Sequence, residues 1–325
     1  MRSFEYTSPH DTGAALDLLG YDGHVRPLAG GTDLLPLLKA DVSAAERLVD
    51  IKRIPELGGG IQATPDGLHI GALSTLSDIE AHPDVRRQYA ALAEAVATAA
   101  TPQLRNMATL GGNLLQRPRC WYFRSRLFPC WLKGGDDCYA REGENQLHAI
   151  FGSSPCVAVH PSDAPAALLA FDAELHITGR AGTRQVRLAD FFVEPTADHR
   201  LEHTLGADEL VVSVRLPRPP DGVRSTYRKA MNRNVWAFAL VGVAAVVQRT
   251  GQRITAARLV LNGVAPIPWR VEAAEQSLVG AEPSPAVFER AADAALATAR
   301  PLGHNAYKLA LARGLIVQAL ESVTA

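Results

Sequence analysis

Apolar positions recur at helical spacing in residues 9–20, after an Asp or Thr that suits a helix N-cap, and Gly20 ends the pattern. A short apolar run at 24–30 predicts a strand, residues 31–42 predict a second helix, and residues 47–51 predict another strand. The chain is therefore expected to open as helix, strand, glycine turn, helix and strand.

The middle of the chain combines short strands with helices of different length. Residues 68–73 predict a strand, and a helix that begins at Ser74 or Thr75 follows and stops at Pro83. We expect one longer helix over residues 85–100, because its apolar residues follow one helical face. This helix leads directly into a second glycine turn.

The region from Asp163 onward returns to strands. Asp163 can cap an Ala-Leu helix that is followed by a strand. Residues 185–194 and 209–220 are then expected to be strands separated by turns. The Pro-rich segment 217–222 is the best candidate linker between domains.

The last hundred residues follow a different pattern. Strand-like runs at 224–230, 236–248 and 253–266 precede two amphipathic helices, at 286–299 and 305–323. This order predicts a separate α+β unit.

Composition limits the classes of function. The chain has 325 residues, is 47% hydrophobic and carries a formal net charge of -1, which is typical of a globular protein of two or three domains. No apolar run reaches the roughly 20 residues of a membrane helix. The balanced charge provides no general attraction to nucleic acid. No charged-then-apolar leader opens the chain, so we expect a cytoplasmic protein.

The four cysteines all lie in one stretch, with nine, seven and seventeen residues between successive sulfurs. They are Cys120, Cys130, Cys138 and Cys156. Disulfides are disfavoured, since a chain of this length buries a core without covalent links. Structural zinc sites usually contain close Cys-x-x-Cys pairs, which are missing here. The spacing favours an iron-sulfur cluster, with zinc and unliganded core cysteines as the alternatives.

Arginines, a lysine and aromatic residues surround these cysteines, in the segments 117–128 and 131–141. Cationic neighbours lower thiolate pKa and offset the negative charge of a cluster, and aromatic rings exclude water from it. The alternative interpretation is a solvated basic loop with a few buried rings.

Two glycine pairs, Gly30 with Gly31 and Gly111 with Gly112, stand at strand-to-helix or helix-to-helix turns. Glycine lets the backbone approach a ligand closely, and the N–H groups of such turns can hold a phosphate. Two such turns could clamp one diphosphate from two sides. Each pair is equally compatible with a tight structural turn.

Several motifs, in order along about 300 residues, resemble the FAD-binding medium subunits of molybdenum hydroxylases, the family of xanthine dehydrogenases, carbon monoxide dehydrogenases and aldehyde oxidoreductases. The motifs are LAGGTDLL at 28–35, IGALSTLSDIE at 70–80, QLRNMATLGGN at 103–113, HPSDAPAALLAFDA at 160–173, YRKAMNR at 227–233, NGVAPIPWR at 262–270 and NAYKLALA at 305–312.

This resemblance implies an α+β fold of two domains. The first, residues 1–219, would be a two-part FAD-binding domain of the molybdopterin dehydrogenase or vanillyl-alcohol-oxidase-like type, with subdomains of about 1–57 and 58–219. Residues 222–325 would form a C-terminal α+β domain like that of carbon monoxide dehydrogenase flavoproteins. The cysteine pattern is similar to the branch of bacterial aldehyde oxidoreductases, in which a loop, here 117–160, carries a 4Fe-4S cluster on four cysteines.

Carried onto this sequence, the resemblance implies the following FAD contacts. The diphosphate and ribityl chain would lie against the two glycine turns, Ser162 and Asp163 would add polar contacts, Leu210 and Val211 would form the adenine wall, and Lys229 would place a positive charge near the flavin. The full implied set is Arg26, Leu28, Ala29, Gly30, Gly31, Thr32, Asp33, Leu34, Leu104, Thr109, Gly112, Asn113, Leu115, Ser162, Asp163, Leu210, Val211 and Lys229.

The resemblance further implies an electron-transfer subunit with no acid-base residue of its own, because the flavin carries the redox step. Its partners would be a large subunit with the molybdenum cofactor and a small subunit with 2Fe-2S clusters, in a heterotrimer or its dimer. The substrates would be aldehydes. The alternatives are a scaffold subunit or a free-standing flavin oxidase, and export to the periplasm together with a signal-bearing partner is the alternative to a cytoplasmic location.

Overall fold

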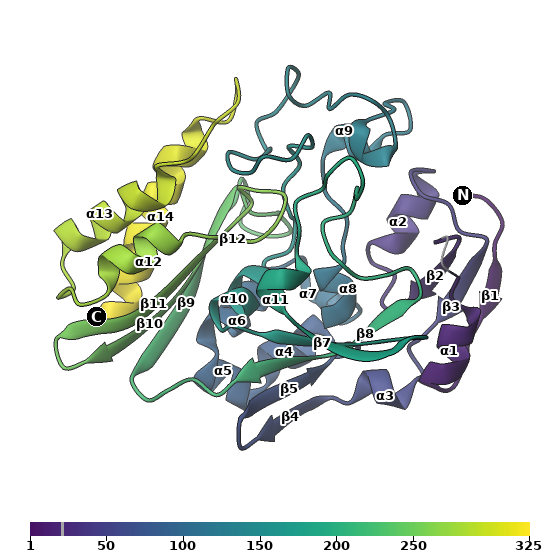
Figure 1. Ribbon diagram of the computed structural model, residues 1–325, viewed down its shortest axis with the longest axis horizontal. Coiled ribbons are helices and arrows are strands. Elements are labelled where there is room, and N and C mark those ends of the chain that lie inside the picture. Colours follow the sequence, from purple (N-terminus) through teal and green to yellow (C-terminus); the bar gives the residue numbers. More distant parts are fainter. Residues whose placement is uncertain (21–22) are drawn as a thin grey trace.

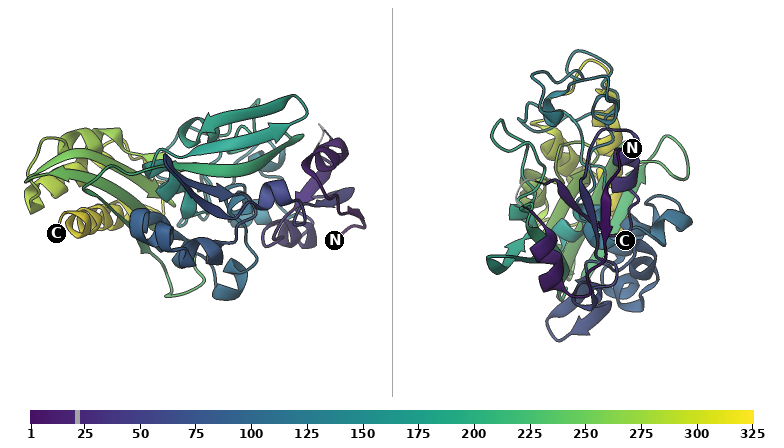
Figure 2. Two further views of the ribbon diagram at one scale, coloured as in Figure 1. Left: turned by 90° about the horizontal axis from the view of Figure 1, so that it is seen from below. Right: turned by 90° about the vertical axis from the view of Figure 1, so that its right-hand side faces the viewer.

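The computed structural model describes residues 1–20 and 23–325, and within them three β-sheets lie in a row along the longest axis of the molecule (Figures 1 and 2). The N-terminus lies beside the first sheet at one end of the row, and the C-terminus beside the third sheet at the other.

The first sheet is parallel, with strand order β1-β3-β2. Asp11 caps the first helix by accepting the N–H of Ala14 at 2.7 Å, and the helix ends before Gly20, as predicted. Its elements are β1 (Glu5–Thr7), α1 (Thr12–Leu18), β2 (Val25–Leu28), α2 (Leu34–Lys39), β3 (Arg47–Asp50) and α3 (Pro55–Gly58).

The second sheet is antiparallel, with order β4-β5-β8-β6-β7, and buries Ile70, Leu175 and Val214 against helices α6 and α10. Thr75 caps α4 with a capping box, as expected for this start. The elements are β4 (Ile61–Thr64), β5 (Gly67–Gly71), α4 (Leu76–Ala81), α5 (Pro83–Gln88), α6 (Ala90–Ala97), α7 (Pro102–Arg105), α8 (Leu110–Leu114), α10 (Ala164–Ala170), β6 (Glu174–Gly179), β7 (Gly182–Arg187), α11 (Leu188–Phe191) and β8 (Glu209–Pro217).

Two predictions for this region were wrong. The single helix expected over residues 85–100 is broken at Tyr89, which has the non-helical angles φ -127° and ψ 50°. The buried Tyr89 ring packs on Phe171, and its hydroxyl donates to Pro217 O at 3.0 Å. Residues 188–191 form a helix instead of a strand, because Leu188 and Phe191, three positions apart, are both buried.

The third sheet is antiparallel, with order β12-β11-β10-β9. Strand β10 is apolar on both faces, since Ala244 and Val246 join the core of the second sheet while Val243 and Ala245 pack under the C-terminal helices. Helix α12 was not predicted. The elements are β9 (Val223–Ala230), β10 (Val241–Thr250), β11 (Arg253–Asn262), β12 (Trp269–Arg270), α12 (Glu272–Leu278), α13 (Pro285–Leu296) and α14 (Tyr307–Thr324).

Residues 117–160, here called the cysteine loop, form the long excursion at the top of Figure 1, between the first and third sheets. Its regular structure is limited to α9 (Trp121–Arg124) and the 3-10 turn η1 (Trp131–Lys133). The loop therefore depends on side-chain packing and on its cysteines for its shape.

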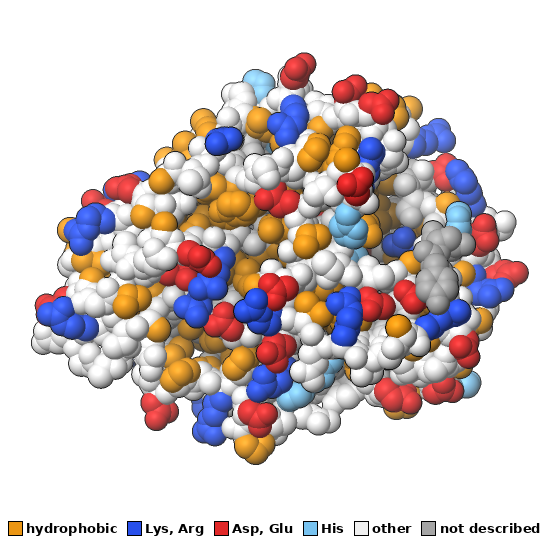
Figure 3. Space-filling view, in the orientation of Figure 1, with side chains coloured by type: hydrophobic (Ala, Val, Ile, Leu, Met, Phe, Trp, Pro, Cys, Tyr) orange, Lys and Arg blue, Asp and Glu red, His pale blue; other side chains and the backbone are white. Residues whose placement is uncertain are grey.

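The outer surface carries both signs of charge interspersed with apolar side chains on the face shown in Figure 3. Among the helices of residues 1–20 and 23–325, none has the length and hydropathy needed to cross a membrane.

Candidate functional site

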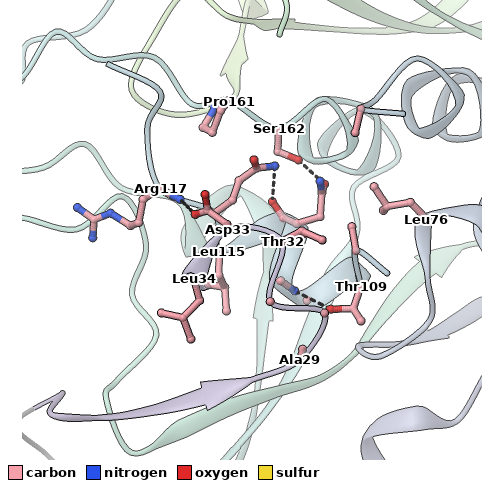
Figure 4. A pocket seen from close by; sticks show the side chains of 18 of the residues that line it. Ala29, Thr32, Asp33, Leu34, Leu76, Thr109, Leu115, Arg117, Pro161 and Ser162 are labelled. Atoms are coloured by element: carbon pink, nitrogen blue, oxygen red, sulfur yellow. Dashed lines mark hydrogen bonds between the residues drawn. The ribbon is translucent and has the colours of Figure 1, made fainter. Parts of the chain in front are cut away.

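A cavity of about 580 Å³ lies where the first and second sheets meet the cysteine loop and a segment after β9. We call it the central cavity, and Figure 4 shows part of its lining. Its size falls within the range of roughly 300–1,000 Å³ that is usual for cofactor and small-molecule sites.

Of the residues predicted to contact FAD, sixteen line this cavity and two do not. Leu28 is buried in the small core beneath α2, and Lys229 lies behind the cavity wall. The sixteen are Arg26, Ala29, Gly30, Gly31, Thr32, Asp33, Leu34, Leu104, Thr109, Gly112, Asn113, Leu115, Ser162, Asp163, Leu210 and Val211.

The two glycine turns contact one another, and the surroundings of their glycines differ from one position to the next. A Cβ on Gly30 would stand 1.9 Å from the backbone oxygen of Met107, so this residue lets the turns pack together. Gly31 has φ +71°, in the left-handed region. A Cβ on Gly112 would meet only Thr109 Oγ1, at 3.1 Å, so this position is open toward the cavity.

The second turn is organised by local hydrogen bonds. Thr109 caps α8 by accepting the N–H of Gly112 at 3.3 Å, and the Ser162 hydroxyl donates to Asn113 Oδ1 (Figure 4). Segments about fifty residues apart thus present their polar side chains to the same side of the cavity.

Asp33 joins the first glycine turn to the cysteine loop. Its carboxylate accepts the backbone N–H of Arg117 at 2.9 Å and the Arg124 guanidinium at 2.8 Å, and pairs with Arg119 at 2.6 Å. Arg117 and Arg119 also line the cavity, although they were predicted only as neighbours of the cysteines.

Positive charge gathers along this part of the wall. Burial, with repulsion from Arg117, lowers the pKa of Arg26, and burial lowers the pKa of Arg119 to about 10. Nε of Arg119 is buried without a hydrogen-bond partner in the described part of the chain. Buried cations with an unused donor suit an anionic group such as a diphosphate.

Asp163 stands at the start of α10, but its side chain makes no cap hydrogen bond. Its buried carboxylate instead accepts from Tyr227 at 2.6 Å, Lys229 at 2.8 Å and Asn262 at 3.0 Å. The side chain of Lys229 is 2% exposed and also donates to Thr98 O. Its charge is therefore paired within the protein, and a positive charge near the flavin at this position stays a prediction.

The C-terminal unit contributes a wall of the cavity that the sequence did not predict. Arg233, Trp236 and Phe238, in the connection between β9 and β10, all line it. The Arg233 guanidinium stacks over Trp236 at 5.0 Å, and Arg119 stacks over Phe238 at 4.8 Å. The stretch NRNVWAF gave no signal for this role, because its position depends on how the sheets pack.

The four cysteines converge, although they are spread over 37 residues of chain. Cys130 and Cys156 are buried in one apolar cluster with Phe123 and Trp131, and Cys120 and Cys138 pack against the same cluster. None of the four forms a disulfide. Cys120 directly follows Arg119, so the cysteines and the cavity share a stretch of backbone.

Each sulfur is approached by backbone N–H groups. The donors are Tyr122 and Phe123 for Cys120, Leu132 and Lys133 for Cys130, Ala140 and Val157 for Cys138, and Ala158 for Cys156. Such donors stabilise negative sulfur, as in thiolates that bind iron-sulfur clusters.

The cysteine pKa values follow from burial and from this proximity. A hydrogen bond from Cys156 lowers the pKa of Cys138 to about 6, whereas burial raises the pKa of Cys120 to about 11.

No group of three or more His, Cys, Asp and Glu side chains in the described residues is arranged to hold a metal ion. A single zinc ion would need its sulfur ligands within about 2.3 Å of one point. A four-iron cluster instead takes one thiolate on each iron, so its ligands lie farther apart. The cluster therefore stays a prediction at this point.

Comparison with known protein families identifies two matches that together span almost the whole chain. Residues 2–219 match the FAD binding domain in molybdopterin dehydrogenase, and residues 225–323 match the CO dehydrogenase flavoprotein C-terminal domain.

Individual relatives agree with these matches. The chain is 41% identical over 302 residues to the aldehyde oxidoreductase FAD-binding subunit PaoB of Escherichia coli. The aligned region covers 92% of this chain and 91% of that protein. It is 30% identical to the carbon monoxide dehydrogenase medium chain of Hydrogenophaga pseudoflava, over 99% of this chain and 97% of that one. A solved structure of carbon monoxide dehydrogenase from that organism superposes with a TM-score of 0.79 at 30% identity, over 99% of this chain and 97% of that chain.

Proposed function

Because the chain belongs to the FAD-binding medium subunits of the molybdenum hydroxylase family, we propose that it is the electron-transfer subunit of a heteromeric aldehyde oxidoreductase. Members of this family are FAD-containing oxidoreductase subunits, and this chain is one of them. The substrate class is proposed from two relatives, an aldehyde oxidoreductase FAD-binding subunit at 41% identity and a glyceraldehyde dehydrogenase medium chain at 28%.

The observation that carries the proposal is the shared wall between the central cavity and the cysteines. Arg117 and Arg119 line the cavity, Asp33 fixes them there, and Cys120 is the next residue along the chain. A redox group bound in the cavity and one bound by the cysteines would therefore share this short stretch of structure.

FAD, when bound in the cavity, would supply the redox chemistry. The chain's own residues would bind and orient it: Gly112 leaves room for it, Thr32 and Asn113 offer polar contacts, and Arg26 and Arg119 offset the charge of a diphosphate. Leu210 and Val211 present an apolar surface that suits the adenine ring.

A 4Fe-4S cluster held by Cys120, Cys130, Cys138 and Cys156 would supply one-electron chemistry. Convergence of the four thiols in one apolar cluster and the N–H groups around each sulfur support this part of the proposal. The arrangement of Trp131 and Phe123 beside the sulfurs would keep water away from the group.

The partners we propose are a large subunit that holds the molybdenum cofactor and oxidises the aldehyde, and a small subunit that holds 2Fe-2S clusters. The formal net charge of -1 on this chain gives no general attraction to phosphate, so nucleic acid is not proposed as a partner. We propose a cytoplasmic location, with co-export by a signal-bearing partner as the alternative.

The proposal is tested by purifying the native complex under anaerobic conditions and analysing each subunit. We expect this chain to retain FAD and about four iron and four sulfide per chain. Aldehyde oxidation should require the large subunit. A colourless chain would favour a scaffold role, and aldehyde oxidation by the isolated chain would favour a free-standing oxidase. Zinc in place of iron would contradict the cluster.

A further inference from the structure

His148 lies against a proposed cluster ligand. Its Nε2 is 3.2 Å from the sulfur of Cys120, and its ring packs edge-on against Trp121 at 5.3 Å between centroids. The residue is only 2% exposed to bulk solvent, although it borders a small cavity of about 240 Å³ together with Cys120. Neither the sequence pattern nor the family match assigns it a role.

The other ring nitrogen decides which atom carries the proton. Nδ1 of His148 is buried and makes no hydrogen bond of good geometry among the described residues; its nearest acceptor is the Asn145 carbonyl, a weak contact that favours the protonated ring. A proton on Nδ1 would leave a buried N–H without a good hydrogen bond, which costs free energy, whereas a proton on Nε2 can be donated to sulfur. The geometry thus favours the tautomer in which His148 is a donor to Cys120.

The backbone around His148 is held by the C-terminal unit. Asn305, fully buried at the start of α14, donates its amide N–H groups to His148 O at 3.1 Å and to Ala149 O at 3.0 Å. Lys308 donates to Leu147 O at 3.2 Å and to Gly263 O at 2.7 Å, which ties the same segment to the end of β11. The buried side chains of Asn305 and Lys308, at the start of α14, therefore fix the backbone that positions the imidazole.

We propose that His148 donates a hydrogen bond from Nε2 to the Cys120 thiolate of the cluster and thereby raises the reduction potential of that cluster, with Asn305 as a positioning residue. This inference rests on the cluster proposed above. A donor to a ligand sulfur stabilises the state with more negative charge, which is the reduced one.

The first measurement needs no variant. The assembled complex is labelled with 15N-histidine, reduced, and studied by pulsed electron paramagnetic resonance. A weak coupling to one histidine nitrogen supports the hydrogen bond. A strong coupling, typical of a nitrogen bound to iron, would make His148 a ligand and overturn the inference, and so would the absence of any nitrogen coupling.

The second measurement compares His148→Phe, which keeps a ring but has no donor, with His148→Gln, whose side-chain amide can still donate. In a redox titration we expect His148→Phe to lower the cluster potential by about 59 mV, a tenfold change in a one-electron equilibrium. His148→Gln should recover part of this shift. The FAD potential serves as the internal control and should change less.

A double-mutant cycle separates positioning from general stability. If Asn305 acts through the imidazole, Asn305→Ala should lower the cluster potential in the wild-type background but add nothing in His148→Phe. Additive shifts would overturn its positioning role, and an unchanged potential in His148→Phe with full iron would overturn the inference while the proposed function stands. Absence of iron from a wild-type chain that retains FAD would overturn the proposed cluster, and absence of both would overturn the proposed function itself.

Discussion

Neighbouring glycines in this protein serve different purposes, and only the structure separates them. Gly30 is needed because the backbone of Met107 occupies the space of a Cβ, whereas Gly112 borders free space in the central cavity. Substitution of Gly30 would therefore disturb the fold, and substitution of Gly112 would test the binding site without a backbone clash.

We expect Gly112→Val to weaken FAD binding at least tenfold, or about 1.4 kcal/mol, because the added side chain enters the cavity. Iron content should stay unchanged. The measurement is a fluorescence titration of the deflavinated subunit with FAD.

Gly314→Val is the matched control, since Gly314 also lies in a helix and a Cβ there would meet nothing within 4 Å. The control should bind FAD as the wild type does. Equal affinity in Gly112→Val and wild type would show that this turn has only a structural role.

At the scale of elements, the cysteine loop stands apart from the rest of the chain. It contains one short helix and one 3-10 turn in 44 residues, and its apolar contacts centre on the cysteines. Its two ends are fixed, at Asp33 by Arg117 and at Ala265 by the N–H of His160. The interior therefore depends on a bound group far more than the ends do.

We predict that Cys138→Ser reduces iron from about four per chain to near zero and makes residues 124–145 sensitive to protease, because cluster binding and loop order are coupled. FAD content should persist, since the loop ends are held independently. Iron analysis, flavin analysis and limited proteolysis followed by mass spectrometry check the three parts.

Glu142→Ala, an exposed change in the same loop, is the control and should retain iron and protease resistance. Full iron in Cys138→Ser would show that Cys138 is not a ligand.

At the scale of the whole molecule, the FAD-binding half and the C-terminal unit share a core. Strand β10 is buried on both faces, and the Asp163 carboxylate accepts from Tyr227 and Asn262 of the third sheet. Such an extensive apolar junction disfavours independent motion of the two units. Buried histidines lie on the FAD-binding side of this junction, and they make the stability of the chain depend on pH.

Burial lowers the pKa of His160 to about 4 and that of His203 to about 3. The unfolded chain binds these protons near pH 6.5, while the folded chain stays neutral until the lower pKa. Stability is therefore complete above pH 6.5 and falls as the pH decreases toward 4, by up to about 1.4 kcal/mol per pKa unit for each residue. Urea unfolding of the isolated subunit between pH 7 and pH 4 measures this loss.

The variant His160→Asn should flatten this pH dependence, because its amide oxygen can accept the N–H of Ser162 in place of Nδ1 but does not titrate. His304→Asn, an exposed substitution, is the control. An unchanged slope in His160→Asn would assign the acid loss to other groups.

The sequence by itself determined the features that depend on near neighbours. The sequence shows the helix caps at Asp11 and Thr75, the apolar periodicity of the C-terminal helices and the two glycine turns. Each of these can be predicted from neighbouring residues, because helix and turn signals extend over only one or two turns of chain. The order of the motifs was sufficient to identify the family, which the family matches confirm. The four cysteines of the sequence all lie in one stretch, which identified the cysteine loop as a distinct segment.

Only the tertiary structure decided which of these residues meet. Asp163 looked like a helix cap, but its carboxylate instead pairs with Lys229, 66 positions away in the sequence. His148 reaches Cys120 across 28 positions, and Arg233 to Phe238 reach the cavity because β10 is buried on both faces and so fixes the third sheet against the second. Contacts of this kind depend on how whole sheets pack. No local pattern of residues shows which residues, far apart in the sequence, will lie next to one another.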